Sequence, residues 1–292
     1  MYYVIVNPTA GKGKAIKIFK KLSERLDISG IEYKTVFTEH KFHASELSKN
    51  AALDGYKSII AVGGDGTVSE VANGIVLSGV SDAVMGVVAC GTGNDLIRSL
   101  NIPKDMDKSL DIILKGSILP IDIGRMNDKY FFNVSSVGFD VEVVQNTEYF
   151  KGKMPGSLAY FCGIIKTLFC LRFKKLTYSI DGGEPVEQEL LLLAAANGKY
   201  YGGGIKVSPY ADLKDGILDI VVIEKVKKRI IPFMLGGFMK GKHTKIKEIT
   251  HTDASSVLIE ADGIIDINLD GEIISGDKMM FTVERAGLKV FV

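Results

Sequence analysis

Three glycine-rich stretches, each placed directly after an apolar run, constrain this chain more than any other feature of its sequence. They read "NPTAGKGK" (7–14), "GGDGT" (63–67) and "GTGND" (91–95). Glycine lets a backbone turn sharply and lets an anion approach bare N–H groups. A helix that follows such a turn directs its free N–H groups and its positive dipole end at the anion. The pattern therefore predicts phosphate-binding turns between strands and helices.

The first 120 residues alternate between strand and helix patterns. Apolar runs predict strands at 2–7, 33–38, 58–64 and 85–91. Apolar residues at helical spacing predict helices at 15–26, 43–53, 67–78 and 104–116. This alternation predicts an α/β domain with a mostly parallel sheet that helices cover on both faces. All three glycine loops then lie at the carboxyl edge of the sheet, where ligands bind.

The second half of the chain has a different pattern, rich in short strands and turns. The Asp-Gly signals at Asp181, Asp262 and Asp270 predict hairpins, and helices are expected at 157–171 and about 229–241. We therefore expect an antiparallel β-sandwich domain over 122–292 after a nucleotide-binding domain over 1–121. The sequence leaves open that the last residues of the chain pack against the first domain.

Composition excludes several classes of protein. The net charge of +1 over 292 residues provides no global field for nucleic acid. Three cysteines without a CxxC pair indicate reduced thiols and a cytoplasmic setting. The N-terminal stretch lacks the basic region of a signal peptide, and no apolar run reaches the ~18 residues of a membrane span. The four histidines show no convincing metal spacing.

Aspartates inside the second and third glycine loops indicate a metal as well as a phosphate. Asp65 and Asp95 would repel a bare phosphate but not one that carries Mg²⁺. The alternative is that both only cap helices, where aspartate is common. No loop matches a standard nucleotide fingerprint, so each is weak alone. Three loops on one edge favour a metal–nucleotide site.

Together the segments "NPTAGKGK", "GGDGTVSEVANG", "GTGNDLIRSL" and "IDIGRMNDKYFFNVSSVGFD" resemble, in order and spacing, the bacterial diacylglycerol kinase catalytic family. Its members are soluble, ATP-dependent lipid kinases. The resemblance implies a nucleotide-binding domain like those of NAD kinases and phosphofructokinases, a C-terminal β-sandwich, and an active site in the cleft between them. It also implies ATP and Mg²⁺ as cofactors and a membrane lipid, diacylglycerol first, as the acceptor.

The resemblance also assigns roles to residues of this sequence. It implies that Glu272 accepts the hydroxyl proton, and that Asp65, Asp95 and Asp122 surround the catalytic metal and its waters. A second Mg²⁺ would bind the Asp215 side chain and the carbonyls of Asp212 and Ile217. The implied ATP contacts are Asn7, Gly11, Lys12, Thr38, Gly64, Asp65, Gly66, Thr67, Glu70, Thr92 and Asn94. Without the resemblance, the sequence favours Glu272 as a solvated glutamate at a hairpin tip, and it leaves residues 212–219 equally open to being an ordinary turn.

Residues 225–247 suit an anionic membrane surface. They contain eight Lys or Arg and no acid, and "IIPFMLGGFM" lies between the basic clusters. The alternative is a core-packed helix with solvated lysines. The apolar run 158–171 is expected to be buried or to line an acyl-chain pocket. We therefore expect a peripheral protein at the inner face of the membrane, and the sequence leaves a homodimer open.

Two other functions remain compatible with these patterns. An enzyme like NAD kinase would use the same glycine loops with a soluble acceptor. A non-catalytic, membrane-binding nucleotide sensor would bind ATP and vesicles without turnover. The presence of both Asp65 and Glu272 favours an enzyme.

Overall fold

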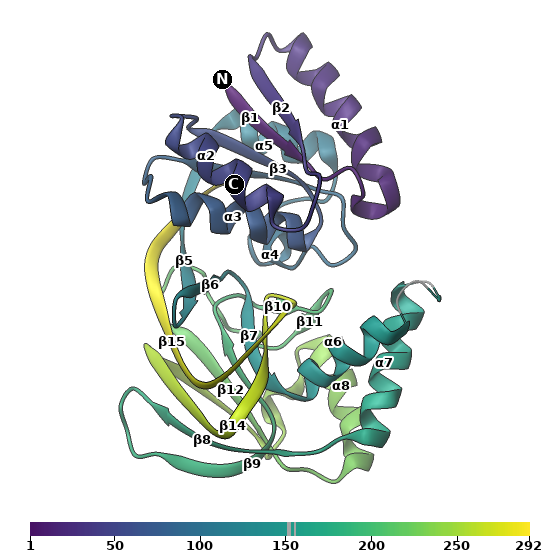
Figure 1. Cartoon of the computed structure of the whole chain (residues 1–292), viewed down its shortest axis with the longest axis vertical. Helices are drawn as coiled ribbons and strands as arrows, with labels where there is room; N and C mark the ends of the chain where they lie inside the picture. Colours follow the sequence, from purple (N-terminus) through teal and green to yellow (C-terminus); the bar gives the residue numbers. More distant parts are fainter. Residues whose placement is uncertain (151–152, 155) are drawn as a thin grey trace.

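The computed structural model of the chain describes residues 1–150, 153–154 and 156–292, and it contains two lobes joined end to end (Figure 1). The first lobe alternates strands and helices. Its elements are β1 (Tyr2–Val6), α1 (Ala10–Ile28), β2 (Tyr33–Phe37), α2 (His43–Leu53), β3 (Ser58–Gly63), α3 (Asp65–Ser78), β4 (Val84–Ala89), α4 (Asp95–Ser99) and α5 (Met106–Lys115).

The inner strands β1, β3 and β4 of the first lobe are buried on both faces, whereas the edge strand β2 is only partly buried. The four strands follow the order β4-β3-β1-β2, and each neighbouring pair is parallel. Alternate residues of β1 enter two different core clusters, Ile5 in one and Val4 in the other. Helices α2 and α3 pack against the first cluster, while α1 and α5 pack against the second. This double burial explains the continuous apolar runs of these strands.

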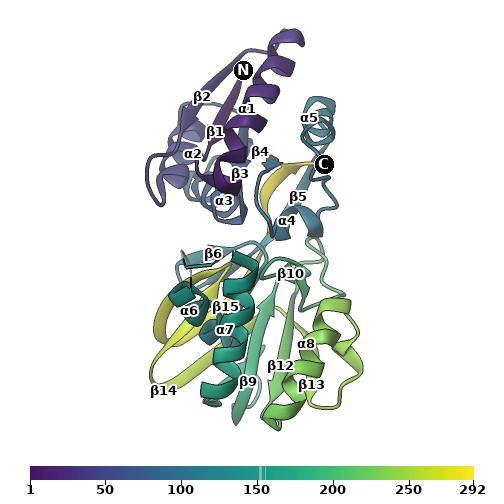
Figure 2. The same cartoon turned by 90° about the vertical axis from the view of Figure 1, so that its right-hand side faces the viewer.

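The second lobe is mainly β-structure with three helices along one side (Figure 2). It contains β5 (Ile118–Met126), β6 (Lys129–Phe131), β7 (Val134–Gly138), α6 (Phe139–Phe150), α7 (Gly156–Cys170), β8 (Lys174–Ile180), β9 (Val186–Ala196), β10 (Tyr200–Tyr201), β11 (Ile205–Lys206), β12 (Leu218–Glu224), α8 (Ile231–Lys240), β13 (Ile249–Ala254), β14 (Ser256–Leu269) and β15 (Glu272–Phe291). Short 3₁₀ helices span Lys228–Ile230 and His243–Lys245. Pairing among these strands is antiparallel.

Two of the three expected hairpins form. The turns at Asp181-Gly182 and Asp270-Gly271 have positive φ at both residues. Asp270-Gly271 is the two-residue loop between β14 and β15, whereas Asp181-Gly182 begins a longer connection between β8 and β9. The hairpin expected at Asp262 is wrong. Strand β14 continues through that position with a register shift between Glu260 and Ile265, so the Asp-Gly pair marks a bulge.

Helices α4 and α6 were not anticipated from the sequence. Helix α4 has only five residues, too few for a periodic pattern. Helix α6 starts directly after the fully buried strand β7, and its first residues alternate apolar and acidic side chains, "FDVEV". Such alternation is typical of a strand, so it does not indicate the start of a helix.

The last strand ties the two lobes together. After pairing with β14, β15 continues antiparallel to β5 and then pairs in parallel with β4, where Lys289 lies opposite Val84. The last residues therefore lie in the sheet of the first lobe, and Figure 1 shows this strand crossing between the lobes.

The apolar helix α7 is more exposed than its sequence predicts. Phe169 is 82% exposed and Phe161 59%, whereas Ala159 and Leu171 at the two ends of the run are buried. The expectation that this run is buried is therefore wrong for part of its length, while the alternative that it lines an acyl-chain pocket stays a prediction. Among the described residues, no helix is both long and apolar enough to span a membrane.

Candidate active site

The three glycine loops meet at the carboxyl ends of β1, β3 and β4. Asn7, directly after β1, donates from Nδ2 to the Thr67 Oγ1 at 2.9 Å. A Cβ on Gly91 would lie 2.8 Å from the Cα of Gly64, and a Cβ on Gly11 would collide with the carbonyl oxygen of Cys90. The close packing of one loop on another therefore requires these glycines, whether or not a ligand also approaches them. Gly66, by contrast, is exposed and borders open space.

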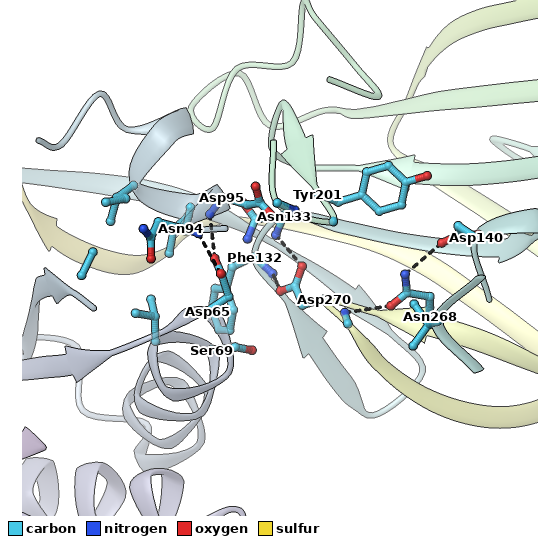
Figure 3. A pocket seen from close by; sticks show the side chains of 18 of the residues that line it. Asp65, Ser69, Asn94, Asp95, Phe132, Asn133, Asp140, Tyr201, Asn268 and Asp270 are labelled. Atoms are coloured by element: carbon cyan, nitrogen blue, oxygen red, sulfur yellow. Dashed lines mark hydrogen bonds between the residues drawn. The ribbon is translucent and has the colours of Figure 1, made fainter. Parts of the chain in front are cut away.

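Asp65 fastens the second loop to the third. Its Oδ2 accepts the backbone N–H of Asn94 at 2.7 Å and its Oδ1 accepts that of Asp95 at 2.6 Å (Figure 3). Gly93 leaves room for this contact, since a Cβ there would lie 2.5 Å from Asp65 Oδ2. Asp65 thus positions the third loop, and each of its oxygens already has one protein donor.

Asp95 keeps one oxygen free. Its Oδ2 accepts the N–H of Gly203, from the loop after β10, at 2.9 Å. Its Oδ1 is buried and has no hydrogen-bond partner among the described residues. Burial raises the pKa of this carboxyl to about 6, the Gly203 N–H opposes that rise, and the negative charge of Asp65 adds to it. A buried carboxylate oxygen without a donor is suited to a divalent cation.

Asp122 does not line the space between the lobes. Its carboxylate accepts the backbone N–H of Gly216 at 2.6 Å and that of Ala286 at 2.8 Å. The residue is buried on β5. Its visible role is to anchor the loop at 212–217, rather than to stand beside Asp65 and Asp95.

The loop at 212–217 presents several oxygen atoms. Asp215 Oδ1 accepts the N–H of Ile217 at 3.0 Å. Burial raises the pKa of Asp215, and the negative charges of Asp212 and Asp122 add to the rise. A cation would relieve this repulsion, and carboxylate and carbonyl oxygens are the ligands that Mg²⁺ or Ca²⁺ prefers.

Glu272 lies across a large cavity from the second glycine loop. This cavity of about 630 Å³ is lined by both lobes, including Asp65, Gly66, Glu70, Asp270 and Glu272. Lys41 Nζ, from the loop before α2, lies 2.9 Å from Glu272 Oε1. The carboxylate therefore faces the site rather than open solvent alone.

Other expected ligand contacts lie at the edge of this space or beyond it. Glu70 lines the cavity, and its Oε2 accepts the N–H of Ala44 at 3.2 Å. Lys12 and Thr92 are exposed, and Thr38 is held through its own N–H to the Val6 carbonyl at 2.9 Å. None of these last three lines the cavity.

Asp270 is a site residue that the sequence presented only as part of a turn. Its buried carboxylate accepts the backbone N–H groups of Phe132 at 2.5 Å and of Asn133 and Val134 at 3.0 Å each. Burial raises its pKa to about 6 even though the three N–H donors oppose the rise. These bonds fix the turn that carries Glu272. In the sequence, the only indication of this role of Asp270 was that the Asp-Gly pair directly precedes the candidate base Glu272.

A smaller cavity of about 190 Å³ continues from the large one between the lobes. Its lining includes four polar side chains that the sequence did not single out: Asp140, Tyr160, Tyr201 and Asn268. Asp140 directly follows the first residue of α6, and Asn268 is on β14. Asp140 was missed because α6 itself was not anticipated, and the other three were missed because they lie far apart in sequence, on α7, β10 and β14.

His40, His43 and Glu46 come together on the surface although their spacing did not suggest it. Their ligand atoms lie within 4.8 Å of one another. However, His43 Nδ1 accepts the backbone N–H of Glu39 at 3.0 Å. A neutral imidazole has only one such lone pair, so a metal would compete with this bond.

The fold and this constellation define a class: a two-domain phosphotransferase-like protein with acids at a glycine-loop rim. Residues 1–126 match the family described as "Diacylglycerol kinase catalytic domain". Residues 133–292 match the "YegS C-terminal NAD kinase beta sandwich-like domain". The chain belongs to the bacterial diacylglycerol kinase catalytic-domain family.

Relatives of similar length support this assignment. The diacylglycerol kinase of Bacillus subtilis is 31% identical over 270 residues, covering 92% of this chain and 88% of the relative. That of Mycobacterium tuberculosis is 30% identical over 275 residues, covering 92% and 87%. A crystal structure of a putative diacylglycerol kinase from Bacillus anthracis superposes with a TM-score of 0.83 at 25% identity, covering 99% of this chain and 94% of that one. The resemblance found in the sequence is confirmed.

Proposed function

We propose that the chain transfers the γ-phosphoryl group of ATP to the free hydroxyl of diacylglycerol, with the active site between the lobes. The observation that carries this proposal is the large cavity, which places Glu272 and the open backbone at Gly66 around one space. The domain over 1–121, together with the end of β15, forms the nucleotide-binding half, and 122–288 forms the other half.

The glycine loops hold the triphosphate. Backbone N–H groups at Gly64 and Gly66 and at the start of α3 supply neutral donors, and the helix dipole favours negative charge there. Asn7 and Thr67 fix the first loop against the second. Gly11, Lys12, Thr38, Glu70, Thr92 and Asn94 form the outer contacts to the nucleotide.

Asp95 Oδ1 fits a divalent cation, and Mg²⁺ is the expected ion. Asp65 stands behind it, because its oxygens position the N–H groups of residues 94 and 95. When bound, the ion neutralises charge that develops on the phosphoryl oxygens. The loop of Asp212, Asp215 and Ile217 fits a second cation, and because none of these residues lines either cavity, this cation is structural.

Glu272 is the general base of this proposal. The acceptor hydroxyl oxygen bonds to Pγ, the bond from Pγ to the β–γ bridging oxygen breaks, and ADP leaves with that electron pair. The hydroxyl proton goes to the Glu272 carboxylate. Lys41 lies beside this carboxylate, with its Nζ 2.9 Å from Glu272 Oε1.

A basic surface near α8 is the proposed contact with the membrane. Phe233 is 82% exposed and Met239 72%, while Ile231, Met234 and Phe238 pack into the core. The helix therefore both packs and presents apolar side chains beside the lysines of 225–247. The lipid acceptor places the protein at the inner, cytoplasmic face of the membrane.

The test is Glu272→Gln, assayed with labelled ATP and diacylglycerol in mixed micelles. Turnover should fall by roughly 10²–10⁴, as expected for loss of a general base, while ATP affinity stays within two-fold. Glu260→Gln is the matched control, because Glu260 is another β-strand glutamate in a surface ion pair, with Lys278 at 2.8 Å. Near-normal turnover in Glu272→Gln would remove it as the base. Labelled NADP formed from NAD, with no labelled lipid, would favour a soluble acceptor instead.

A further inference from the structure

The smaller cavity has a buried polar end that the phosphoryl chemistry does not use. It shares Asp65, Ser69, Asp270 and Gly271 with the large cavity, so the two are continuous. From that shared wall it extends into the second lobe, where Asp140, Tyr160, Tyr201 and Asn268 line it. Figure 3 shows Asp140 and Asn268 at the end away from Asp65.

Asp140 presents one carboxyl oxygen without a partner. The residue is 6% exposed, and its Oδ2 receives two hydrogen bonds, from Ser136 Oγ at 2.5 Å and from Asn268 Nδ2 at 2.8 Å. Its Oδ1 is buried and has no partner among the described residues. Buried polar atoms are seldom left unpaired. The free oxygen therefore indicates a ligand group.

The surroundings of Asp140 favour a neutral carboxylic acid. The cavity lining contains no Lys, Arg or His; its other titratable groups are Asp65, Asp95, Asp270, Tyr160 and Tyr201. Burial raises the pKa of Asp140, and its hydrogen bonds to Ser136 and Asn268 oppose the rise. A neutral acid in an apolar site can donate a hydrogen bond from the oxygen that carries the proton.

We propose that this cavity is the headgroup subsite for an acyl-ester glycerolipid, and that Asp140 donates from Oδ1 to an ester carbonyl of the acceptor. This inference rests on the proposed kinase function and adds the residue that recognises the ester group of the substrate. An ester carbonyl is a good acceptor and carries no donor, so it matches a protonated carboxyl and not a carboxylate.

The same residue is connected to the proposed base. Asn268 donates to Asp140 Oδ2, and its own Oδ1 accepts the N–H of Gly271 at 2.7 Å. Gly271 directly precedes Glu272. One chain of hydrogen bonds thus links the group that binds the ester to the turn that presents the base. It sets the spacing between the ester carbonyl and the reacting hydroxyl.

The experiment compares two lipids on the full-length protein: 1,2-diacylglycerol and its 1,2-dialkyl ether analogue, which lacks both carbonyls. Wild type should show a kcat/KM roughly ten-fold higher for the diester, the scale of one buried hydrogen bond with its desolvation cost. Asp140→Leu should reduce this preference to near one. Asp140→Asn keeps a donor and should retain most of the preference. Ser136→Ala is the matched control, since it removes a bond to Oδ2 and leaves Oδ1 intact.

Each outcome decides one question. If wild type phosphorylates both lipids equally, or if Asp140→Leu keeps the diester preference, the subsite assignment is overturned while the kinase function stands. If wild type phosphorylates neither lipid, the kinase proposal itself is overturned. The wild-type comparison needs no variant, so the proposal remains falsifiable if Asp140→Leu does not fold. The KM for ATP and the melting temperature should stay unchanged in Asp140→Asn.

Discussion

Replacing Asp95 by asparagine should make the protein more stable and inactive at the same time. The pKa of Asp95 rises from 3.8 to about 6 on folding, chiefly because the carboxyl is buried. A folded-state pKa above the unfolded one means that stability is greatest below the unfolded pKa and is lost as pH rises through the folded pKa. At pH 7.5 the wild-type protein therefore carries the whole cost of this buried charge.

The size of the effect follows from that shift. At about 1.4 kcal/mol per pKa unit, holding Asp95 ionised costs about 3 kcal/mol. The amide of Asp95→Asn has the same shape and no charge, and the pKa shift already includes the bond from Gly203. The net stabilisation should therefore be about 3 kcal/mol, or a rise in melting temperature of roughly 6–12 °C.

The assay is thermal unfolding with EDTA, at pH 7.5 and at pH 5. At pH 5 most of the folded wild-type carboxyl is protonated while the unfolded one is still largely ionised, so the difference between the two proteins should fall to about half of its value at pH 7.5. Lipid kinase activity of the variant should be lost at both pH values. A variant less stable than wild type at pH 7.5, or a difference that does not depend on pH, would refute the account of Asp95 as an uncompensated buried charge.

Three further changes test other parts of the structure. Asp65→Asn should destabilise the protein by roughly 2–4 kcal/mol in urea unfolding, because the NH₂ group of the new amide would face one of the two backbone N–H donors and could not accept its hydrogen bond. An unchanged urea midpoint would contradict the role of Asp65 in holding the third loop. Burial lowers the pKa of His243 to about 4, so the free energy of unfolding of the wild type should fall by up to about 3 kcal/mol as pH falls from 6.5 to 4. This loss should be absent from His243→Gln. Equal dependence of stability on pH in the two proteins would contradict this prediction. Changing Lys227, Lys228 and Arg229 to Gln should weaken binding to phosphatidylserine vesicles by roughly 100-fold at low salt. The same change at three lysines of α1 is the control and should leave vesicle binding nearly unchanged. If both triple variants lose the same vesicle affinity, the effect is due to net charge and not to this surface.

The alternation of strands and helices in the first lobe was predictable from the sequence, for a physical reason. Strands buried on both faces need continuous apolar runs, and β1, β3 and β4 have them. Glycines follow because the loops at the ends of these strands pack on one another as well as on a ligand. The contact between Gly91 and Gly64 shows that packing of one loop on another is enough to require glycine at some of these positions.

The second lobe was less predictable because its decisive contacts join residues far apart in sequence. Asp270 binds the N–H groups of residues 132–134, and Asp122 binds those of Gly216 and Ala286. No local pattern reveals such pairs. The family resemblance placed Asp122 with the catalytic acids, whereas both of its oxygens here hold backbone of the second lobe.

Hydrogen-bond occupancy separates the acids of this site better than their positions in motifs do. Asp65 and Asp270 accept at least two backbone N–H groups each, so they hold loops in place. Asp95 and Asp140 each keep a buried oxygen without a protein donor. These two oxygens line the same cavity, one near the glycine-loop rim and one deep in the second lobe. A ligand that satisfies both must present a cation-bound phosphate at one end and an uncharged hydrogen-bond acceptor at the other, as ATP and a glycerol ester do together.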